Sequence, residues 1–263
     1  MRPFTIATAG AALLAAGLPA PAPAQGQFHW QGHLAAGKRL EIKGVNGDIQ
    51  ATAGSGDQAE VTATKHARNS DTASVEIKVV PFAGGVAICA VYPTSRGARE
   101  PNGCDAGQGY HSSTENNDVV VDFAVRVPAG VELSASTVNG HVDADGLAGN
   151  VDANTVNGSI HLSTSGYAEA RTVNGSIGAT LGRADWTDRV GFETVNGGIT
   201  LTFPASLSTE VRAETVNGDI ESDFPLTVSG RFGPRRVNGT IGSGGRKLEL
   251  HTVNGGIRLK KST

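Results

Sequence analysis

Large side chains are scarce in this chain of 263 residues, of which 5% are aromatic and one is methionine. A conventional globular core needs more of them, because bulky side chains supply much of the buried apolar area. Glycine is abundant instead, with 36 residues, about twice ordinary usage. This composition favours short strands and tight turns, stacked so that small residues meet small residues.

The short motifs of common enzyme sites are also missing. The sequence has no G-x-S-x-G, H-E-x-x-H or Walker loop, and no G-x-G-x-x-G before a helix. The histidines are dispersed; His141 and His161 hold comparable places near successive turns, where a chance surface pair is the simpler interpretation. Asp143, Asp145 and Asp152 suggest calcium, but the nonapeptide of calcium-binding β-rolls is absent. We predict no catalytic residue, no cofactor and no metal.

The first 24 residues have the layout of a secretory signal peptide. Arg2 gives a positive start, an uncharged and mostly apolar run follows from Phe4 to Leu18, and Ala22-Pro23-Ala24 is a small-residue cleavage site. That run is too short to span a bilayer, and no later stretch approaches the length of a membrane span. We therefore expect a mature chain without a transmembrane segment, exported to the periplasm or to the cell surface.

Cysteine usage agrees with export. The chain has two cysteines, Cys89 and Cys104, which we predict to form a structural disulfide that closes a loop in an oxidising compartment. A reactive thiol pair is the alternative, although the two residues lack C-x-x-C spacing.

A Val-Asn-Gly sequence recurs eight times along the chain. Its asparagines are Asn46, Asn139, Asn157, Asn174, Asn196, Asn217, Asn238 and Asn254. Apolar residues stand six and four positions before the asparagine and three after it, and threonine stands two before it in six copies. A period of two on both sides of a turn predicts strand, turn, strand.

One copy alone would be a β-hairpin, since Asn-Gly is a strong hairpin signal. However, the residue before each asparagine is valine in all eight copies, and in a lone hairpin it would face solvent. We infer that something packs on it, and therefore favour a solenoid over independent hairpins, with each residue stacked on its equivalent in the next coil. Asparagine amides would pair from coil to coil.

Glycine after the asparagine would let the backbone turn the corner without a Cβ clash. The array glycines in this position are Gly140, Gly158, Gly175, Gly197, Gly218, Gly239 and Gly255. The threonine lies on the same side of the strand as the buried residues two and four positions before it. Its hydroxyl is therefore expected to bond neighbouring backbone. Arg236 and Gly44 replace this threonine in two copies, which puts regular stacking in doubt there.

We thus predict an all-β, solenoid-like stack of about seven coils in residues 131–263, preceded by an N-terminal β cap. The cap would comprise residues 25–130, with one Val-Asn-Gly copy, strand-like runs at 75–80, 86–92 and 118–127, and a cysteine-bearing loop. Such a cap hides the first open edge of an array.

Basic residues concentrate near the C-terminus. Residues 225–263 hold eight Lys or Arg against the single acid Glu249, whereas residues 25–224 hold 13 basic and 24 acidic side chains. The basic residues are Arg231, Arg235, Arg236, Arg246, Lys247, Arg258, Lys260 and Lys261. The simpler interpretation is a solvated end; the alternative is a tip that contacts an anionic surface.

Together, these features resemble the bacterial putative-adhesin family of β-strand repeats, a domain family of unknown function. The resemblance rests on the signal peptide, the cysteine-bearing insertion, the strand ending at Val127-Pro128 and the serial Thr-Val-Asn-Gly-x-Ile repeats, and it covers about residues 30–260. It implies an extracytoplasmic β-repeat architecture and an adhesin role, and it defines no catalytic or binding residues.

The hypothesis that fits best is a secreted, non-enzymatic protein of adhesion or envelope structure. Its partner would be a protein or polysaccharide of the envelope or surface, with no nucleic acid and no small-molecule substrate. The alternative is a polysaccharide-binding or polysaccharide-processing solenoid, for which stacking would gather Glu193, Glu214, Asp219 and Glu221. A third hypothesis is a periplasmic partner of a stress-signalling system.

Overall fold

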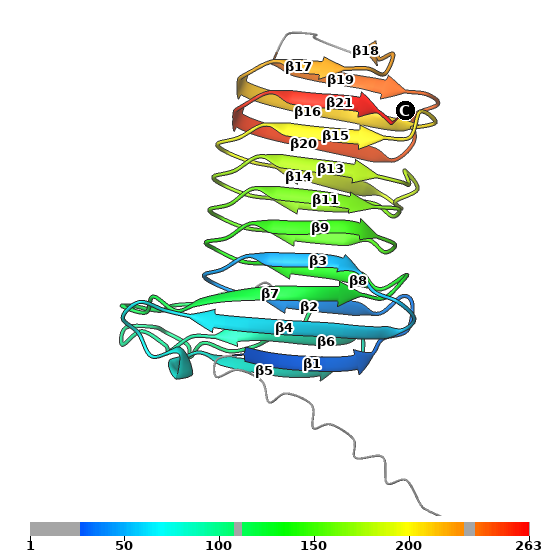
Figure 1. Cartoon of the computed structure of the whole chain (residues 1–263). Coiled ribbons are helices and arrows are strands. Elements are labelled where there is room, and N and C mark those ends of the chain that lie inside the picture. Colours follow the sequence, from blue (N-terminus) through cyan, green and yellow to red (C-terminus); the bar gives the residue numbers. More distant parts are fainter. Residues whose placement is uncertain (1–26, 108–111, 229–234, 263) are drawn as a thin grey trace, which may run out of the picture.

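The chain folds into an elongated stack of strands in two facing sheets (Figure 1). The computed structural model describes residues 27–107, 112–228 and 235–262, so the expected signal peptide lies outside the described residues. Apart from the single 3₁₀ turn η1 (Thr72–Ser74), the regular structure of the described residues is β. The predicted all-β, solenoid-like fold is confirmed.

Sheet A has ten strands and sheet B has eleven. In spatial order, sheet A contains β1 (Gln27–His33), β4 (Gln58–His66), β7 (Val120–Val127), β3 (Ile49–Ala53), β9 (Val142–Leu147), β11 (Ile160–Thr164), β13 (Ile177–Leu181), β15 (Ile199–Phe203), β21 (Ile257–Lys261) and β17 (Ile220–Ser222). In the same direction, sheet B contains β5 (Glu76–Phe82), β6 (Gly85–Val91), β2 (Arg39–Lys43), β8 (Glu132–Ser136), β10 (Val151–Asn154), β12 (Ala168–Arg171), β14 (Arg189–Glu193), β20 (Lys247–Asn254), β16 (Thr209–Asn217), β19 (Arg236–Ile241) and β18 (Thr227–Val228).

Each coil consists of one strand of sheet B, a Val-Asn-Gly corner and one strand of sheet A. Seven coils stack in parallel register, and their corner asparagines meet in the order 46, 139, 157, 174, 196, 254 and 217. The coil of β20 and β21, which comes last in the chain, therefore lies between the coil of β14 and β15 and the coil of β16 and β17. The order along the stack departs from the order along the chain at this one place among the described coils.

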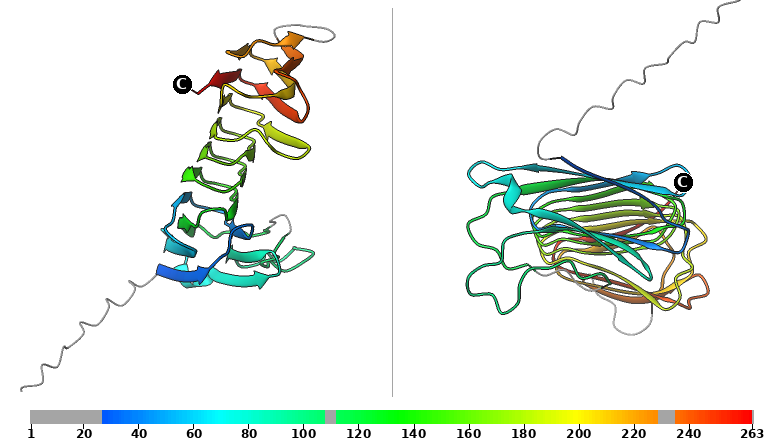
Figure 2. Two further views of the ribbon diagram at one scale, coloured as in Figure 1. Left: turned by 90° about the vertical axis from the view of Figure 1, so that its right-hand side faces the viewer. Right: turned by 90° about the horizontal axis from the view of Figure 1, so that it is seen from below.

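The Asn46 copy belongs to the stack. Its strands β2 and β3 pair in parallel with β8 and β9 and form the first coil. Beneath it, β1, β4 and β7 extend sheet A, and β5 and β6 extend sheet B, with antiparallel pairing at β1–β4, β4–β7 and β5–β6. The N-terminal cap is therefore smaller than residues 25–130: it consists of β1, β4, β5, β6 and β7, which cover the first coil, and Figure 2 shows it as the base of the stack.

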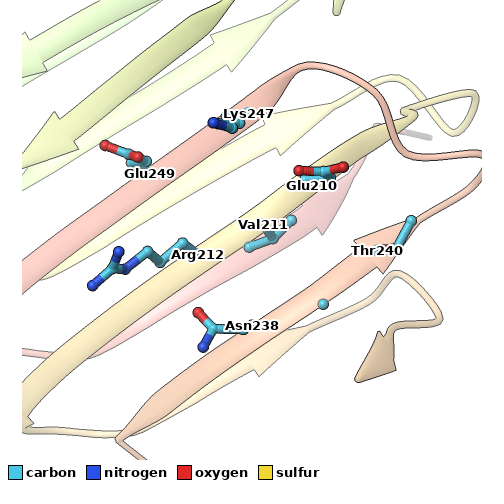
Figure 3. Close-up of a pocket in the computed structure, with 8 residues that line it drawn as sticks. Glu210, Val211, Arg212, Asn238, Thr240, Lys247 and Glu249 are labelled. Carbon is cyan, nitrogen blue, oxygen red and sulfur yellow. The ribbon is translucent and has the colours of Figure 1, made fainter. Parts of the chain in front are cut away.

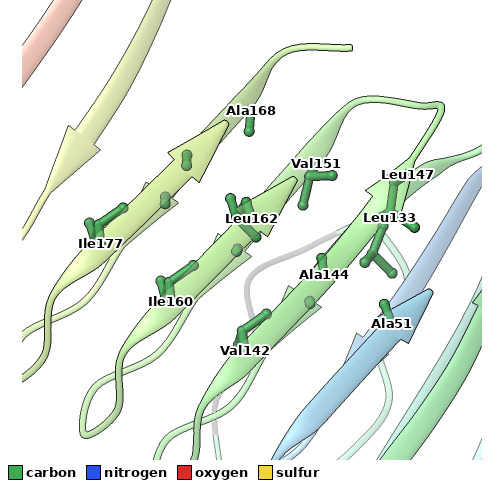
Figure 4. Packing of buried hydrophobic residues seen from close by; sticks show 14 of the residues in the cluster. Ala51, Leu133, Val142, Ala144, Leu147, Val151, Ile160, Leu162, Ala168 and Ile177 are labelled. Atoms are coloured by element: carbon green, nitrogen blue, oxygen red, sulfur yellow. The ribbon is translucent and has the colours of Figure 1, made fainter. Parts of the chain in front are cut away.

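Small residues fill the space between the sheets, as the composition predicts. Ala135, Ala153 and Ala170 occupy equivalent places on neighbouring strands of sheet B, and all three are fully buried. Opposite them, Val142, Ile160 and Ile177 lie side by side in sheet A (Figure 4). The alanine row continues with the fully buried Phe192, and Trp186 and Phe203 are also buried, so small residues fill the middle coils and a few large side chains fill the space beyond them.

The eighth copy, at Asn238, forms no coil, contrary to the prediction of one turn column. It lies within β19, where Asn238 faces Arg212 of the antiparallel strand β16, and Gly239 faces Val211. A physical reason is visible in its sequence: Arg236 replaces the threonine that six of the other seven copies carry, and this long charged side chain is exposed rather than buried. At Gly44 the doubt about stacking is wrong, because Gly44 N–H donates to Ser136 O at 2.8 Å and the corner joins the column.

Candidate binding surfaces

The corner asparagines form one continuous ladder along the outside of the stack. Each side-chain amide Nδ2 donates to Oδ1 of the asparagine in the coil nearer the cap, over 2.7–2.8 Å in six successive pairs. At the cap end, Asn46 Nδ2 donates to Val119 O at 3.4 Å, and the hydroxyl of Tyr92 donates to the same carbonyl at 2.9 Å. The amide ladder ties coils that are distant in sequence into one rod.

Behind the asparagines, the corner threonines are buried and bond backbone. Their Oγ1 atoms donate to the carbonyl of the corner glycine in the coil nearer the cap, over 2.8–3.0 Å. The prediction of inward hydroxyls is confirmed. Gly44 needs no such hydroxyl, because the coil that carries it has only the cap beneath it. These threonines therefore present no hydroxyl array to an outside ligand.

The corner glycines are required by the closeness of the next coil. A Cβ built at Gly140, Gly158, Gly175, Gly197, Gly218 or Gly255 would lie 1.9–2.1 Å from the carbonyl oxygen of the stacked glycine. Positive φ is not the cause, since among the described corner glycines Gly47 alone has one, at 125°. Steric exclusion by neighbouring backbone explains why glycine recurs.

Most corner valines point outward, contrary to the expectation that another element packs on them, although Val45 of the first coil is buried at 7% exposure. Val156, Val173, Val195 and Val216 are 38–49% exposed, and Val138 is half-buried. Except in Val216, which lies in the outermost coil, the carbonyl of each accepts the N–H of the asparagine in the next coil, as in Asn174 N–H to Val156 O at 2.7 Å. A β-branched residue suits this extended corner, but it forms an exposed ridge.

Outward side chains of sheet B form a plane of alternating charge. Glu169 and Glu193 lie 3.5 and 3.9 Å from Arg171, and Arg189 lies 3.2 Å from Glu249. Farther along, Glu214 contacts both Arg212 and Arg236, at 3.1 and 3.0 Å. The described carboxylates of this face are thus largely paired with guanidinium groups, which leaves little free charge for acid–base chemistry.

Three hollows interrupt this plane in the part of the chain that the structure describes. The first, of about 410 Å³, lies over β20, β16 and β19 and is lined by Lys247, Glu249, Arg212 and Asn238 (Figure 3). The second lies where Gly191 leaves a gap in the outward row, between Tyr167, Glu169 and Glu193. The third lies between Glu193, Glu214 and His251. Burial raises the pKa of Glu169, against the attraction of the Arg171 guanidinium.

Stacking places Glu193 and Glu214 along one hollow, as the sequence order suggests, but not side by side. His251 lies between them, paired in register with both, because the C-terminal coil separates their strands. The two glutamates are therefore two strand spacings apart, roughly 10 Å. Asp219 and Glu221 lie apart from these two: Glu221 is on β17 of sheet A, and Asp219 directly precedes that strand.

The basic residues near the C-terminus do not form one tip. Arg236 and Lys247 belong to sheet B, while Arg258 and Lys260 belong to sheet A, one coil inside the end of the stack. Several are engaged: Arg258 bonds Glu221 at 2.7 Å, Arg246 Nη1 donates to Ala184 O at 3.0 Å, and Lys261 Nζ lies 5.3 Å from the Phe224 ring centre. Arg235 is exposed, and Arg231 lies outside the described residues.

The outer face of sheet A carries a histidine and carboxylates without a metal cluster. His161 Nδ1 lies 3.2 Å from Asp143, whereas His141 Nδ1 accepts the N–H of Ser159 at 3.0 Å, so the two imidazoles serve different partners. No group of three or more metal-ligating side chains occurs within residues 27–107, 112–228 and 235–262. In the same part of the chain, no helix has the length and apolarity that a membrane crossing demands.

Cys89 and Cys104 form the predicted disulfide, with Cα atoms 5.6 Å apart. It holds a loop over two charged residues that sequence reasoning missed: Glu41 and Lys43, which are 2% and 3% exposed and 3.0 Å apart. Gly107 N–H donates to both carboxylate oxygens of Glu41 at 3.0 Å. The alternation of side chains along β2 shows from the sequence that both residues face outward from the sheet. That the loop near Gly107 covers them can be seen only in the structure.

The family described as Toastrack DUF4097 matches residues 25–260, so the chain belongs to the Toastrack family of domains of unknown function. A putative cell adhesion protein from Clostridium sporogenes is similar at 12% identity and a TM-score of 0.44, over 90% of this chain and all of that one. A putative adhesin from Bacteroides fragilis is similar at 11% identity and a TM-score of 0.28, over 91% of this chain and 99% of that one. No curated protein matches the chain.

Proposed function

We propose that this protein is an exported, non-enzymatic β-repeat protein that acts in adhesion or in the structure of the bacterial envelope. It binds an envelope or surface component over a long rigid face. The observation that carries the proposal is the unbroken asparagine ladder, which fixes seven coils as one rod with wide outward faces. Membership of a family with adhesin-named structural neighbours supports it.

Rigidity matters for such a role. A flat partner is bound by many weak contacts in register, and each side chain that is already held in place costs less entropy on binding. On sheet B, the ion pairs at Arg171, Arg189 and Glu214 hold the outward side chains in place. The mixed charge pattern suits a partner that carries both polar and charged groups, such as a protein or a substituted polysaccharide.

The test is saturable binding of the labelled mature chain, residues 25–263, to isolated envelope fragments and intact cells. Two matched charge-reversal variants locate the face: R171E/R212E changes sheet B, and R258E/K260E changes sheet A. We expect one pair to weaken binding and the other to leave it intact. Absence of saturable binding to every fraction would refute the proposal, and loss with added salt would implicate the charged residues.

One observation favours a second candidate, a polysaccharide-binding or polysaccharide-processing protein. The hollow beside Gly191 places the half-buried Tyr167 next to Glu169, whose pKa is raised by burial, and near Glu193. Glycoside hydrolysis uses a pair of carboxyl groups that flank the scissile bond. A glycan array followed by turnover assays distinguishes the candidates: hydrolysis lost in both E169Q and E193Q indicates an enzyme, and binding without turnover indicates an adhesin.

A further inference from the structure

The coil of β20 and β21 occupies a slot between two coils that earlier residues of the chain form. After β15, the chain skips the next position in the stack and forms the coil of β16 and β17 one position farther on. It then continues through β18 and β19. Only then do β20 and β21 return to the level that was left open, as the red strands between the yellow and orange ones in Figure 1 show. The neighbouring coils thus frame a site for one Val-Asn-Gly coil.

The inserted coil is bonded on both sides. In sheet B, β20 pairs with β14 from Lys247 to His251 and with β16 from Lys247 to Asn254. In sheet A, β21 pairs with β15 on one side and β17 on the other. At the corner, Asn254 donates to Asn196 and accepts from Asn217, at 2.7 and 2.8 Å. Without this coil, four strand edges would lose their partners at once.

The strands of this coil, β20 and β21, pair with the rest of the described chain only along the four strand edges of the slot. The coil joins the rest through residues 242–246, in which Gly242, Gly244 and Gly245 have φ values of 59°, 73° and 112°. This backbone conformation is natural for glycine. Exchange must also break the bonds that hold the link, such as Ser243 N–H to Ser208 Oγ and Arg246 Nη1 to Ala184 O, both at 3.0 Å. An identical element whose strand pairing is confined to one slot is what domain swapping exchanges between protomers.

We propose that the slot takes the C-terminal coil of a second copy of this chain, so that the protein self-associates by exchanging residues 247–261. Every contact of the inserted coil is reproduced when an identical segment comes from another molecule. The exposed edges of the open slot supply the drive, since unpaired strand edges seek a strand. Mutual exchange closes a dimer, whereas one-way exchange continues from copy to copy into an open chain. The proposal does not depend on which envelope component the protein binds.

Register-specific cross-linking tests the exchange. Glu193 of β14 and His251 of β20 are exposed partners across the slot, and the described residues contain no free cysteine. Full mature chains carrying E193C or H251C are refolded together with the Cys89–Cys104 disulfide retained, and are then oxidised. We expect a covalent dimer whose yield rises with total protein concentration, as mass action requires.

Two controls make either outcome decisive. S134C and D152C mark β8 and β10, whose coils are consecutive in the chain, so their mixture should give no more dimer than each variant alone. The double variant E193C/H251C should close its disulfide within one chain, which proves that the geometry permits the bond. If it closes while the mixed single variants stay at the control level at every concentration, exchange is refuted. Loss of envelope binding in any variant bears on the proposed function alone.

Discussion

The side-chain amide of Asn254 donates to Oδ1 of Asn196 over 2.7 Å, although 58 residues separate the two in the chain. The bond joins the C-terminal coil to a coil completed before β16 and β17 were made. The order of the coils along the ladder therefore differs from their order along the chain. Any coil with the same corner sequence satisfies its neighbour equally well, because the ladder uses only groups that every copy carries.

The ladder predicts a directional effect of Asn174→Asp. Asn174 donates to Asn157 and accepts from Asn196, so a carboxylate at this position keeps the acceptor but loses the donor and faces the Asn157 oxygen. We expect a loss of about 1–2 kcal/mol in the free energy of unfolding, which urea titration measures. Asn238→Asp, outside the ladder, should change it by less than about 0.5 kcal/mol. Equal effects of the two substitutions would show that the amide ladder contributes no stability.

Corner glycine is predicted to be irreplaceable where the next coil touches it. In Gly175→Ala, the new Cβ would meet the Gly158 carbonyl oxygen at 2.0 Å, and backbone cannot move aside cheaply. We expect a loss of about 3 kcal/mol or more, or failure to fold. Gly178→Ala in the same coil is the matched control, since its Cβ would meet only the flexible His161 ring at 3.4 Å. A stable Gly175→Ala protein, judged by thermal unfolding, would contradict the proposed steric role.

The repeat predicts that a copy forms a coil, but it does not predict where in the stack that coil lies. Thr194, Val195, Asn196 and Gly197 have the same sequence as five other corners, so local pattern determines strand, corner and buried parity. It carries no information on which coil lies beside which, because every pairing satisfies the same bonds. For the same reason the row in which His251 separates two glutamates could not be predicted. The sequence of the Asn238 copy did contain a signal, because Arg236 stands where six copies have threonine and Pro234 stands four positions before the asparagine.

Because the corner threonine is buried, we predict that the hydrogen bond of its hydroxyl contributes more to stability than the volume of its side chain does. Thr194 is 2% exposed, and its Oγ1 donates to Gly175 O at 2.8 Å. Thr194→Val keeps the shape and leaves the carbonyl with one bond fewer, which should cost about 1–2 kcal/mol. Thr194→Ser retains the donor and loses only a methyl group, so we expect about 1 kcal/mol. Chemical denaturation of both variants gives the comparison, and a more stable valine variant would refute the hydroxyl's contribution.

The disulfide is predicted to stabilise the loop that seals Glu41 and Lys43. Cys89 and Cys104 are 15 residues apart, and closing a loop of this size in the unfolded chain contributes about 3 kcal/mol. Cys89→Ser/Cys104→Ser should lower the free energy of unfolding by roughly that amount. Hydrogen exchange should rise at Gly107, whose N–H bonds the Glu41 carboxylate. Unchanged exchange at Gly107 would mean that the loop holds its place without the covalent link.

Asp118 is predicted to make the cap sensitive to acid. Its carboxylate accepts the N–H groups of Asn69 and Ser70 at 3.0 and 2.8 Å, and hydrogen bonds led by Ser70 lower its pKa to about 2. Because the folded pKa lies below the ordinary value of 3.8, the stabilisation is complete above that pH and is lost as the pH falls through about 2. Asp118→Asn removes this dependence. The stability gap between the native chain and the variant, measured by urea unfolding, should therefore be constant from pH 7 to pH 5 and shrink between pH 4 and pH 2. A gap that stays constant down to pH 2 would show that the turn at residues 68–70 does not rely on the ionised carboxylate.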